Sequence, residues 1–108
     1  MSNDSTLIYR ERSTLWIVIN RPEDMNALTP SVISGLNSAC DEVERDQSIR
    51  ALVITGAPSE STQNFSVGMD INFLGECFAD IEGTFIPFVT SLHKVLLRLE
   101  SLPVPVIA

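Results

Sequence analysis

The sequence predicts an α/β fold, because two apolar, strand-like runs flank a well-marked helix. The run "TLWIVIN" occupies residues 14–20, the helix is expected at 30–45, and "RALVITG" follows at 50–56. Two parallel strands need a crossover connection of about this length, which is usually a helix. Strand, helix and strand in this order therefore predict a right-handed crossover within one sheet.

The first element is expected to be a strand pair. Residues 6–20, "TLIYRERSTLWIVIN", contain two apolar runs joined by a tight turn near Arg12–Ser13. Both faces of the second run are largely apolar, which is typical of a strand covered on both sides. Its alternating positions are Leu15, Ile17 and Ile19 on one face, and Trp16, Val18 and Asn20 on the other. A polar loop, "RPEDMNAL", follows at residues 21–28.

The helix that follows carries clear start signals. Thr29 is a plausible N-cap, and Pro30 occupies the first helical position, where a missing N–H costs nothing. Its apolar positions recur at helical spacing and form one stripe. They are Val32, Ile33, Leu36, Ala39, Cys40 and Val43. The next run, 50–56, is short, apolar and closed by a glycine, which suits a buried parallel strand.

The second half begins with a polar loop, "APSESTQN", at residues 57–64. Residues 72–83, "NFLGECFADIEG", are ambiguous and allow a short helix followed by a loop. A helical stripe returns from Phe85 to Leu99, with Pro87 acceptable only in its first turn. The apolar residues of this stripe are Phe85, Phe88, Val89, Leu92, Val95, Leu96 and Leu99. The final run, "LPVPVIA" at 102–108, resembles the start of another buried strand. Since domains seldom finish inside an apolar strand, residues 1–108 are expected to be the front part of a single larger domain.

Composition limits the classes of function. With 44% hydrophobic and 19% charged residues, the chain is globular and not disordered. Its formal net charge of −7 argues against nucleic acid or an anionic membrane as the main partner. One histidine and two scattered cysteines, Cys40 and Cys77, predict no metal site and no disulfide. Without a secretory signal or an apolar run long enough to span a bilayer, a cytoplasmic location is expected.

One short stretch, "NFSVGMDI" at residues 64–71, has an unusual pattern. Its alternation of apolar residues would suit a half-buried strand, yet glycine inside a strand often marks a bulge or a close approach to the backbone. Gly68 could expose neighbouring N–H groups that bind an anion or a developing oxyanion. Alternatively, Gly68 forms a simple turn and Asp70 caps the next helix. The pattern alone leaves both interpretations open.

Four motifs together add a family resemblance. They are "INRPEDMNALT" (19–29), "ALVITG" (51–56), "NFSVGMDI" (64–71) and "LPVPVIA" (102–108). Their order and spacing resemble the enoyl-CoA hydratase/isomerase, or crotonase, superfamily from about Leu7 to Ala108. The resemblance implies repeated ββα units around a spiral core, and an acyl-CoA thioester as ligand. It implies no cofactor beyond the coenzyme A of that substrate.

The resemblance also implies a set of site residues. In this family two backbone N–H groups hold the thioester carbonyl, and one would come from Met69, with Gly68 allowing the thioester close to the chain. Alanine is common in place of Met69, and lysine or arginine in place of Met25, so this chain departs from the pattern at both positions. The remaining residues carried over as substrate or coenzyme A contacts are Met25, Ala27, Leu28, Ser66, Asp70, Ile71 and Asn72.

Three polar residues are weaker candidates for the functional site. A few relatives use a histidine near His93, but a partly exposed helix residue is the favoured interpretation. Glu76 and Asp80 follow the glycine motif, where some relatives bring a carboxylate near the acyl group, yet both are expected to be solvated loop residues.

The reaction implied is hydration of a 2-enoyl-CoA, or other chemistry through a thioester enolate, in a trimer or hexamer of identical chains. The family's second N–H donor and its catalytic carboxylates lie beyond Ala108. The 108 residues alone are therefore expected to be inactive. The alternative function is a non-catalytic interaction module, or one part of a split protein.

Overall fold

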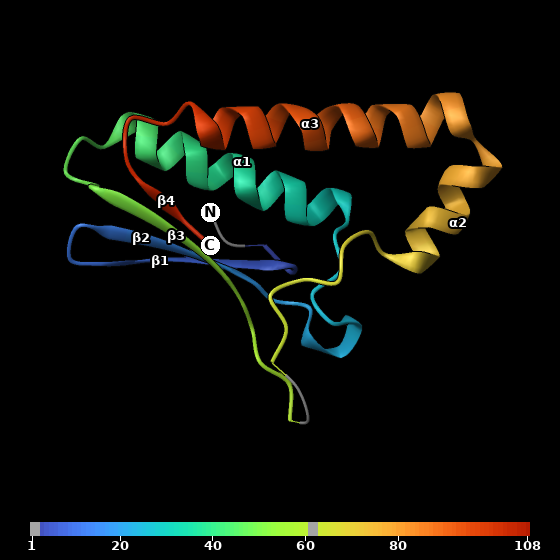
Figure 1. Cartoon of the computed structure of the whole chain (residues 1–108), viewed down its shortest axis with the longest axis horizontal. Coiled ribbons are helices and arrows are strands. Elements are labelled where there is room, and N and C mark those ends of the chain that lie inside the picture. Colours follow the sequence, from blue (N-terminus) through green and yellow to red (C-terminus); the bar gives the residue numbers. More distant parts are fainter. Residues whose placement is uncertain (1–2, 61–62) are drawn as a thin grey trace.

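A four-stranded sheet forms the base of the computed structural model, which describes residues 3–60 and 63–108 (Figure 1). Its strands lie in the order β1-β2-β3-β4. They span Thr6–Glu11, Thr14–Ile19, Ala51–Gly56 and Val106–Ile107. β1 and β2 pair antiparallel, and β3 is parallel to both β2 and β4. The predicted strand pair is confirmed, and so is the helical connection between two parallel strands, β2 and β3.

Three α-helices accompany the sheet: α1 spans Pro30–Arg45, α2 Ile71–Ala79 and α3 Ile86–Glu100. Helix α1 lies across the sheet and α3 runs beside α1 (Figure 1). Helix α2 projects beyond the sheet, and its Phe73 packs edge-to-face against Phe88 of α3, with ring centroids 4.8 Å apart. The predicted start of α1 is confirmed, since the Thr29 side chain accepts a hydrogen bond of 3.4 Å from the Val32 N–H. Within the described residues, no helix is both long and apolar enough to cross a membrane.

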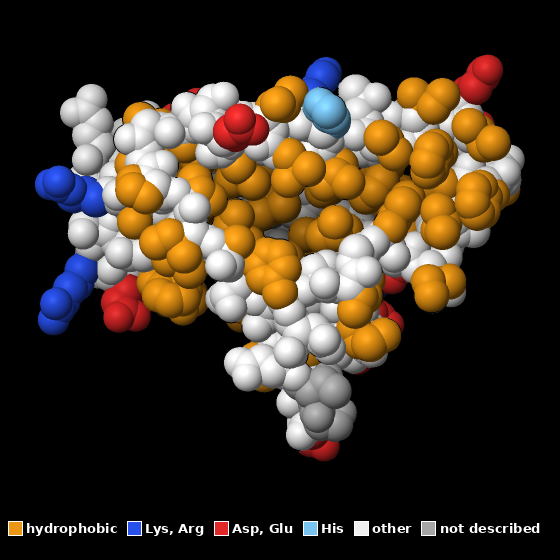
Figure 2. All heavy atoms as spheres, in the orientation of Figure 1, with side chains coloured by type: hydrophobic (Ala, Val, Ile, Leu, Met, Phe, Trp, Pro, Cys, Tyr) orange, Lys and Arg blue, Asp and Glu red, His pale blue; other side chains and the backbone are white. Residues whose placement is uncertain are grey.

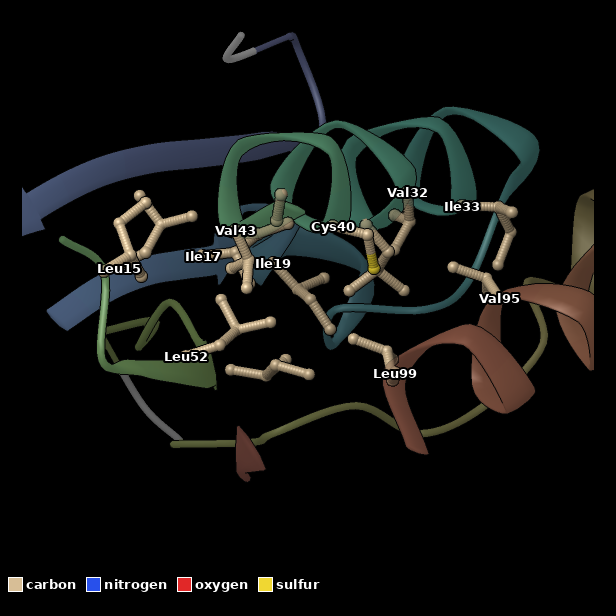
Figure 3. Packing of buried hydrophobic residues seen from close by; sticks show 14 of the residues in the cluster. Leu15, Ile17, Ile19, Val32, Ile33, Cys40, Val43, Leu52, Val95 and Leu99 are labelled. Carbon is tan, nitrogen blue, oxygen red and sulfur yellow. The ribbon is translucent and has the colours of Figure 1, made fainter. Parts of the chain in front are cut away.

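The hydrophobic core lies between one face of the sheet and the two long helices. In Figure 3, Ile17 and Ile19 of β2 face Val32 and Cys40 of α1, and Leu99 of α3 closes the cluster. All five side chains are buried. The alternation of β2 therefore directs one set of side chains inward, as a strand requires.

The opposite face of β2 corrects the prediction of a strand covered on both sides. Trp16 and Val18 are only half-buried, because the helices of the described structure lie on one side of the sheet. Tyr9 of β1 stacks on Trp16, with ring centroids 6.0 Å apart and nearly parallel planes. β3 behaves in the same way, with Val53 half-buried, so its complete burial was also predicted wrongly.

The second half departs from the sequence pattern in three places. Residues 72–83 contain most of α2, which ends at Ala79, and then a single π-helical turn, Ile81–Phe85, in place of the predicted loop. On α3, Phe88, Val95 and Leu99 are buried as predicted, whereas Val89 and Leu96 are exposed. The predicted final strand is reduced to two residues. The loop predicted at 57–64 lies partly outside the described residues.

Both cysteines are buried and free, as the sequence predicts. Burial raises the pKa of the Cys40 thiol above its ordinary value, and the nearby positive charge of Arg98 opposes part of that rise. A buried thiol of raised pKa is a poor nucleophile, because the reactive form is the thiolate. Cys40 therefore acts as a core residue.

Candidate functional site

The loop between β2 and α1 has an unusual backbone. After a short 3₁₀ turn, Pro22–Asp24, both Met25 and Asn26 adopt positive φ values, 55° and 57°. Asparagine tolerates this left-handed conformation better than most residues, whereas methionine rarely adopts it. Contacts elsewhere must therefore hold the loop in this shape.

Asn26 supplies three of those contacts. Its side-chain oxygen accepts a hydrogen bond of 2.9 Å from the Arg21 N–H. Its side-chain nitrogen donates to the Ala57 carbonyl at 2.9 Å and to the Asn64 carbonyl at 2.7 Å. The residue is only 1% exposed. Asn26 therefore joins the loop after β2 to the segment after β3.

The segment that contains Met69 is irregular, and its strand character is limited to one parallel bridge between Leu28 and Met69. The Leu28 N–H donates to the Gly68 carbonyl at 2.6 Å, and the Asp70 N–H donates to the Leu28 carbonyl at 3.0 Å. In a planar trans peptide the N–H points opposite to the preceding carbonyl. The Met69 N–H therefore points away from Leu28. It donates to no group among the residues that the structure describes.

Gly68 makes this geometry possible through its backbone. Its φ of +99° lies in the region that residues with a side chain rarely adopt, and a Cβ added there would meet no atom within 4 Å. The need for glycine is thus conformational, with open space beside it. The Gly68 N–H donates a hydrogen bond of 3.1 Å to the Ser66 hydroxyl, and this contact stabilises the turn on the N-terminal side of Gly68.

Asp70 has the role that the simple alternative predicted, and a second one. One carboxylate oxygen accepts a hydrogen bond of 2.9 Å from the Phe73 N–H and caps α2. The other oxygen lies 3.1 Å from a guanidinium nitrogen of Arg21. Asp70 is 7% exposed, so this ion pair is nearly buried. The cap hydrogen bond first, and then Arg21, lower the pKa of the carboxyl below its ordinary value, although burial opposes them.

This lowered pKa predicts a dependence of stability on pH. A carboxyl of depressed pKa stabilises the folded state above its unfolded pKa of about 3.9, and the contribution disappears as the pH falls through the folded value. Asp70→Asn keeps an N-cap but has no acid to titrate. The full-length wild-type protein should lose more unfolding free energy between pH 7 and about pH 3 than this variant, as measured by urea titration. Equal losses would contradict the assignment.

The remaining predicted contacts fall into two groups. Leu28, Ser66 and Gly68 line the same apolar cavity of about 260 Å³ beneath α3. Figure 2 shows hydrophobic side chains gathered below α3 on this face. The rest of the lining is Ile19, Leu36, Ile54, Phe65, Leu92, Leu96 and Leu99. The chemistry of this cavity fits an apolar chain.

The second group does not line this cavity. Met25 is 51% exposed and Ile71 82% exposed, and Asn72 is also at the surface. Ala27, in the same loop as Met25, is buried. A larger cavity of about 510 Å³ lies between α1 and α3, and none of the predicted site residues lines it.

The three weaker candidates lie at the surface. His93 is exposed on α3, Glu76 is exposed on α2, and Asp80 is exposed with one oxygen accepting from the Gly83 N–H at 3.0 Å. The exposed interpretation is confirmed for each, although Glu76 belongs to a helix and not a loop. Sequence reasoning missed Arg21, whose only local signal is its place in the 19–29 motif.

Comparison with known proteins matches residues 14–108 to the family model described as enoyl-CoA hydratase/isomerase. A short-chain-enoyl-CoA hydratase of Clostridium acetobutylicum is 33% identical over the whole chain, which covers 39% of that protein. A crotonyl-CoA hydratase of Syntrophomonas wolfei is 31% identical, with the same coverage. Among solved structures, an enoyl-CoA hydratase/isomerase from Xanthobacter autotrophicus Py2 is similar over 97% of this chain and 38% of its own, with TM-score 0.83 and 25% identity. The chain spans about two fifths of the length of these relatives.

Proposed function

Because this chain belongs to the enoyl-CoA hydratase/isomerase family, we propose that it forms the acyl-CoA-binding part of an enzyme that hydrates a 2-enoyl-CoA thioester. The Met69 N–H, which has no acceptor within residues 3–60 and 63–108, carries the proposal. A donor fixed in advance by the surrounding backbone stabilises negative charge as it develops, without reorganisation at the moment of reaction. The thioester oxygen is the atom that gains this charge.

The chemistry needs such a donor. When water adds to C3 of a 2-enoyl thioester, the electron pair of the C2–C3 double bond moves toward the carbonyl oxygen and forms an enolate. Protonation at C2 then restores the carbonyl and yields a 3-hydroxyacyl thioester. The Met69 N–H would hold the enolate oxygen, and the first turn of α2 adds the positive end of its dipole nearby.

The proposal gives this chain one part of the catalytic machinery. A second N–H donor and the carboxylates that move the protons must come from other residues of the complete enzyme. The apolar cavity beside Gly68 would take the start of the acyl chain. The exposed positions Met25, Ile71 and Asn72 would face the coenzyme A portion. Coenzyme A would enter only as part of the substrate. The cytoplasmic location and the trimeric or hexameric assembly remain predictions.

The test is a hydration assay of the full-length protein with crotonyl-CoA and with longer 2-enoyl-CoA esters. Hydration removes the conjugated double bond, so the ultraviolet absorbance of the enoyl thioester should fall with time. Butyryl-CoA, which lacks the double bond, serves as the control and should bind without reacting. If no enoyl-CoA of any chain length binds or reacts, the proposal is wrong and the interaction-module alternative gains support.

A further inference from the structure

We propose that Arg21 is a positioning residue that holds the Met69 N–H in its direction and neutralises the carboxylate beside it. The inference rests on the proposed function, because it concerns the same N–H group. What suggests it is a juxtaposition: one guanidinium contacts the chain on both sides of the Leu28–Met69 bridge.

The contacts of Arg21 are specific and largely shielded from water. One terminal nitrogen donates to the Ala27 carbonyl at 2.8 Å. The other lies 3.1 Å from Asp70 and 3.0 Å from the more exposed Asp24. The arginine side chain itself is only 16% exposed. A rigid planar fork can satisfy a carbonyl and a carboxylate at once, whereas a lysine ammonium on its flexible stem cannot reproduce that geometry.

The contacts of Arg21 lie next to the Leu28–Met69 bridge, which fixes the direction of the Met69 N–H. Ala27 directly precedes Leu28, and Asp70 directly follows Met69, so the guanidinium links the two bridged segments next to their point of pairing. Keeping Leu28 paired with the Gly68 carbonyl keeps the Met69 N–H pointing the opposite way. Without Arg21, the two segments would be joined by the two backbone hydrogen bonds of the bridge, by the hydrogen bond of 3.2 Å from the Val67 N–H to the Met25 carbonyl, and by Asn26.

Charge gives a second reason for the arginine. The nearly buried Asp70 carboxylate belongs to the residue after the donor, so its negative charge opposes a negative charge on the thioester oxygen. Arg21 is the cation paired with it. Removing Arg21 would leave an uncompensated carboxylate beside the developing oxyanion, while removing both charges would relieve that repulsion.

The test uses the full-length protein and 4-dimethylaminocinnamoyl-CoA. The absorption maximum of this thioester moves to longer wavelength when its carbonyl oxygen is strongly polarised. The wild type should shift the bound probe, and Arg21→Gln should lose most of the shift. For crotonyl-CoA, kcat should fall by about 10- to 100-fold with KM little changed, as expected for a misplaced donor. Arg45→Gln removes an exposed arginine of α1 and should change neither property.

The wavelength of the absorption maximum of the bound probe distinguishes a misplaced Met69 N–H from a general loss of folding. A partly unfolded sample lowers the amplitude of the bound spectrum, but it does not move its maximum. The double variant Arg21→Gln/Asp70→Asn, whose asparagine can still cap α2, should regain part of the kcat lost by Arg21→Gln. If Arg21→Gln does not fold, Arg21→Lys decides the matter, and it should keep only part of the shift.

The possible outcomes distinguish the two proposals. A wild-type shift that persists unchanged in Arg21→Gln, or in Arg21→Lys where that variant is used, overturns the role of Arg21 and leaves the proposed function standing. A wild-type protein that binds the probe with no shift contradicts the oxyanion role of Met69, and the inference falls with it. A shift lost in the Arg21 variants and kept in Arg45→Gln supports the inference.

Discussion

Gly68→Val should lower kcat for 2-enoyl-CoA hydration by about 10²- to 10³-fold, the usual effect of losing one oxyanion donor. Space is not the obstacle, because a Cβ at Gly68 would meet no atom within 4 Å. The obstacle is the φ of +99°, which a β-branched residue rarely adopts. To relieve that strain, the 68–69 peptide would rotate, and the Met69 N–H would turn with it.

The measurement is steady-state hydration of crotonyl-CoA by the full-length protein, with a thermal melt of each variant. Gly75→Val is the matched control, because Gly75 lies in α2 with open space beside it and no positive φ. The control should keep kcat within about twofold, since a surface change costs little. A Gly68→Val enzyme that folds and keeps wild-type kcat would contradict the role given to the Met69 N–H.

The parts of the fold that the sequence predicted are those with local signals. Thr29 and Pro30 mark the start of α1, and the alternation in residues 14–19 marks the inward face of β2. The exposure of Trp16 could not be read in this way, because an apolar residue on a strand looks the same whether or not a layer covers it. The residue types along a strand show which side chains could be buried. The arrangement of the other elements decides which of them are buried.

The π-helical turn after α2 has a similar explanation. Asp80 accepts a hydrogen bond from the Gly83 N–H, and this short-range contact starts a wide turn that continues into α3. An aspartate followed three residues later by glycine also occurs in ordinary loops, so the sequence pattern did not distinguish the two. Helical spacing is equally unable to show whether a side chain is buried. Val89 and Leu96 follow the predicted helical spacing, yet their side chains face solvent.

The candidate site also contains local features that the sequence predicts and tertiary contacts that it does not. The importance of Gly68 and the cap at Asp70 could be predicted from neighbouring residues, because turns and caps are local. The Arg21–Asp70 ion pair joins residues 49 positions apart, and the Leu28–Met69 bridge also depends on tertiary pairing. No spacing rule predicts either contact. The direction of the Met69 N–H, on which the proposed chemistry depends, therefore emerged only from the structure.

Asn26→Ala should destabilise the full-length protein by about 2–4 kcal/mol, because buried hydrogen-bonding groups lose their partners. The change removes the acceptor for the Arg21 N–H and the donor to the Ala57 and Asn64 carbonyls. Alanine also tolerates the φ of 57° less well than asparagine does. Unfolding in urea, followed by circular dichroism, measures the loss.

Two further variants show what the amide contributes. Gln47→Ala removes an exposed amide and should change the free energy of unfolding by no more than about 0.5 kcal/mol. Asn26→Asp keeps the acceptor and the tolerance of a left-handed backbone, but it directs a carboxylate at the two carbonyl oxygens that Asn26 now serves as donor. Aspartate should therefore be no better than alanine. If aspartate restored wild-type stability, backbone preference alone would explain this position, and the connection that Asn26 makes to the Asn64 end of the Met69 segment would contribute nothing.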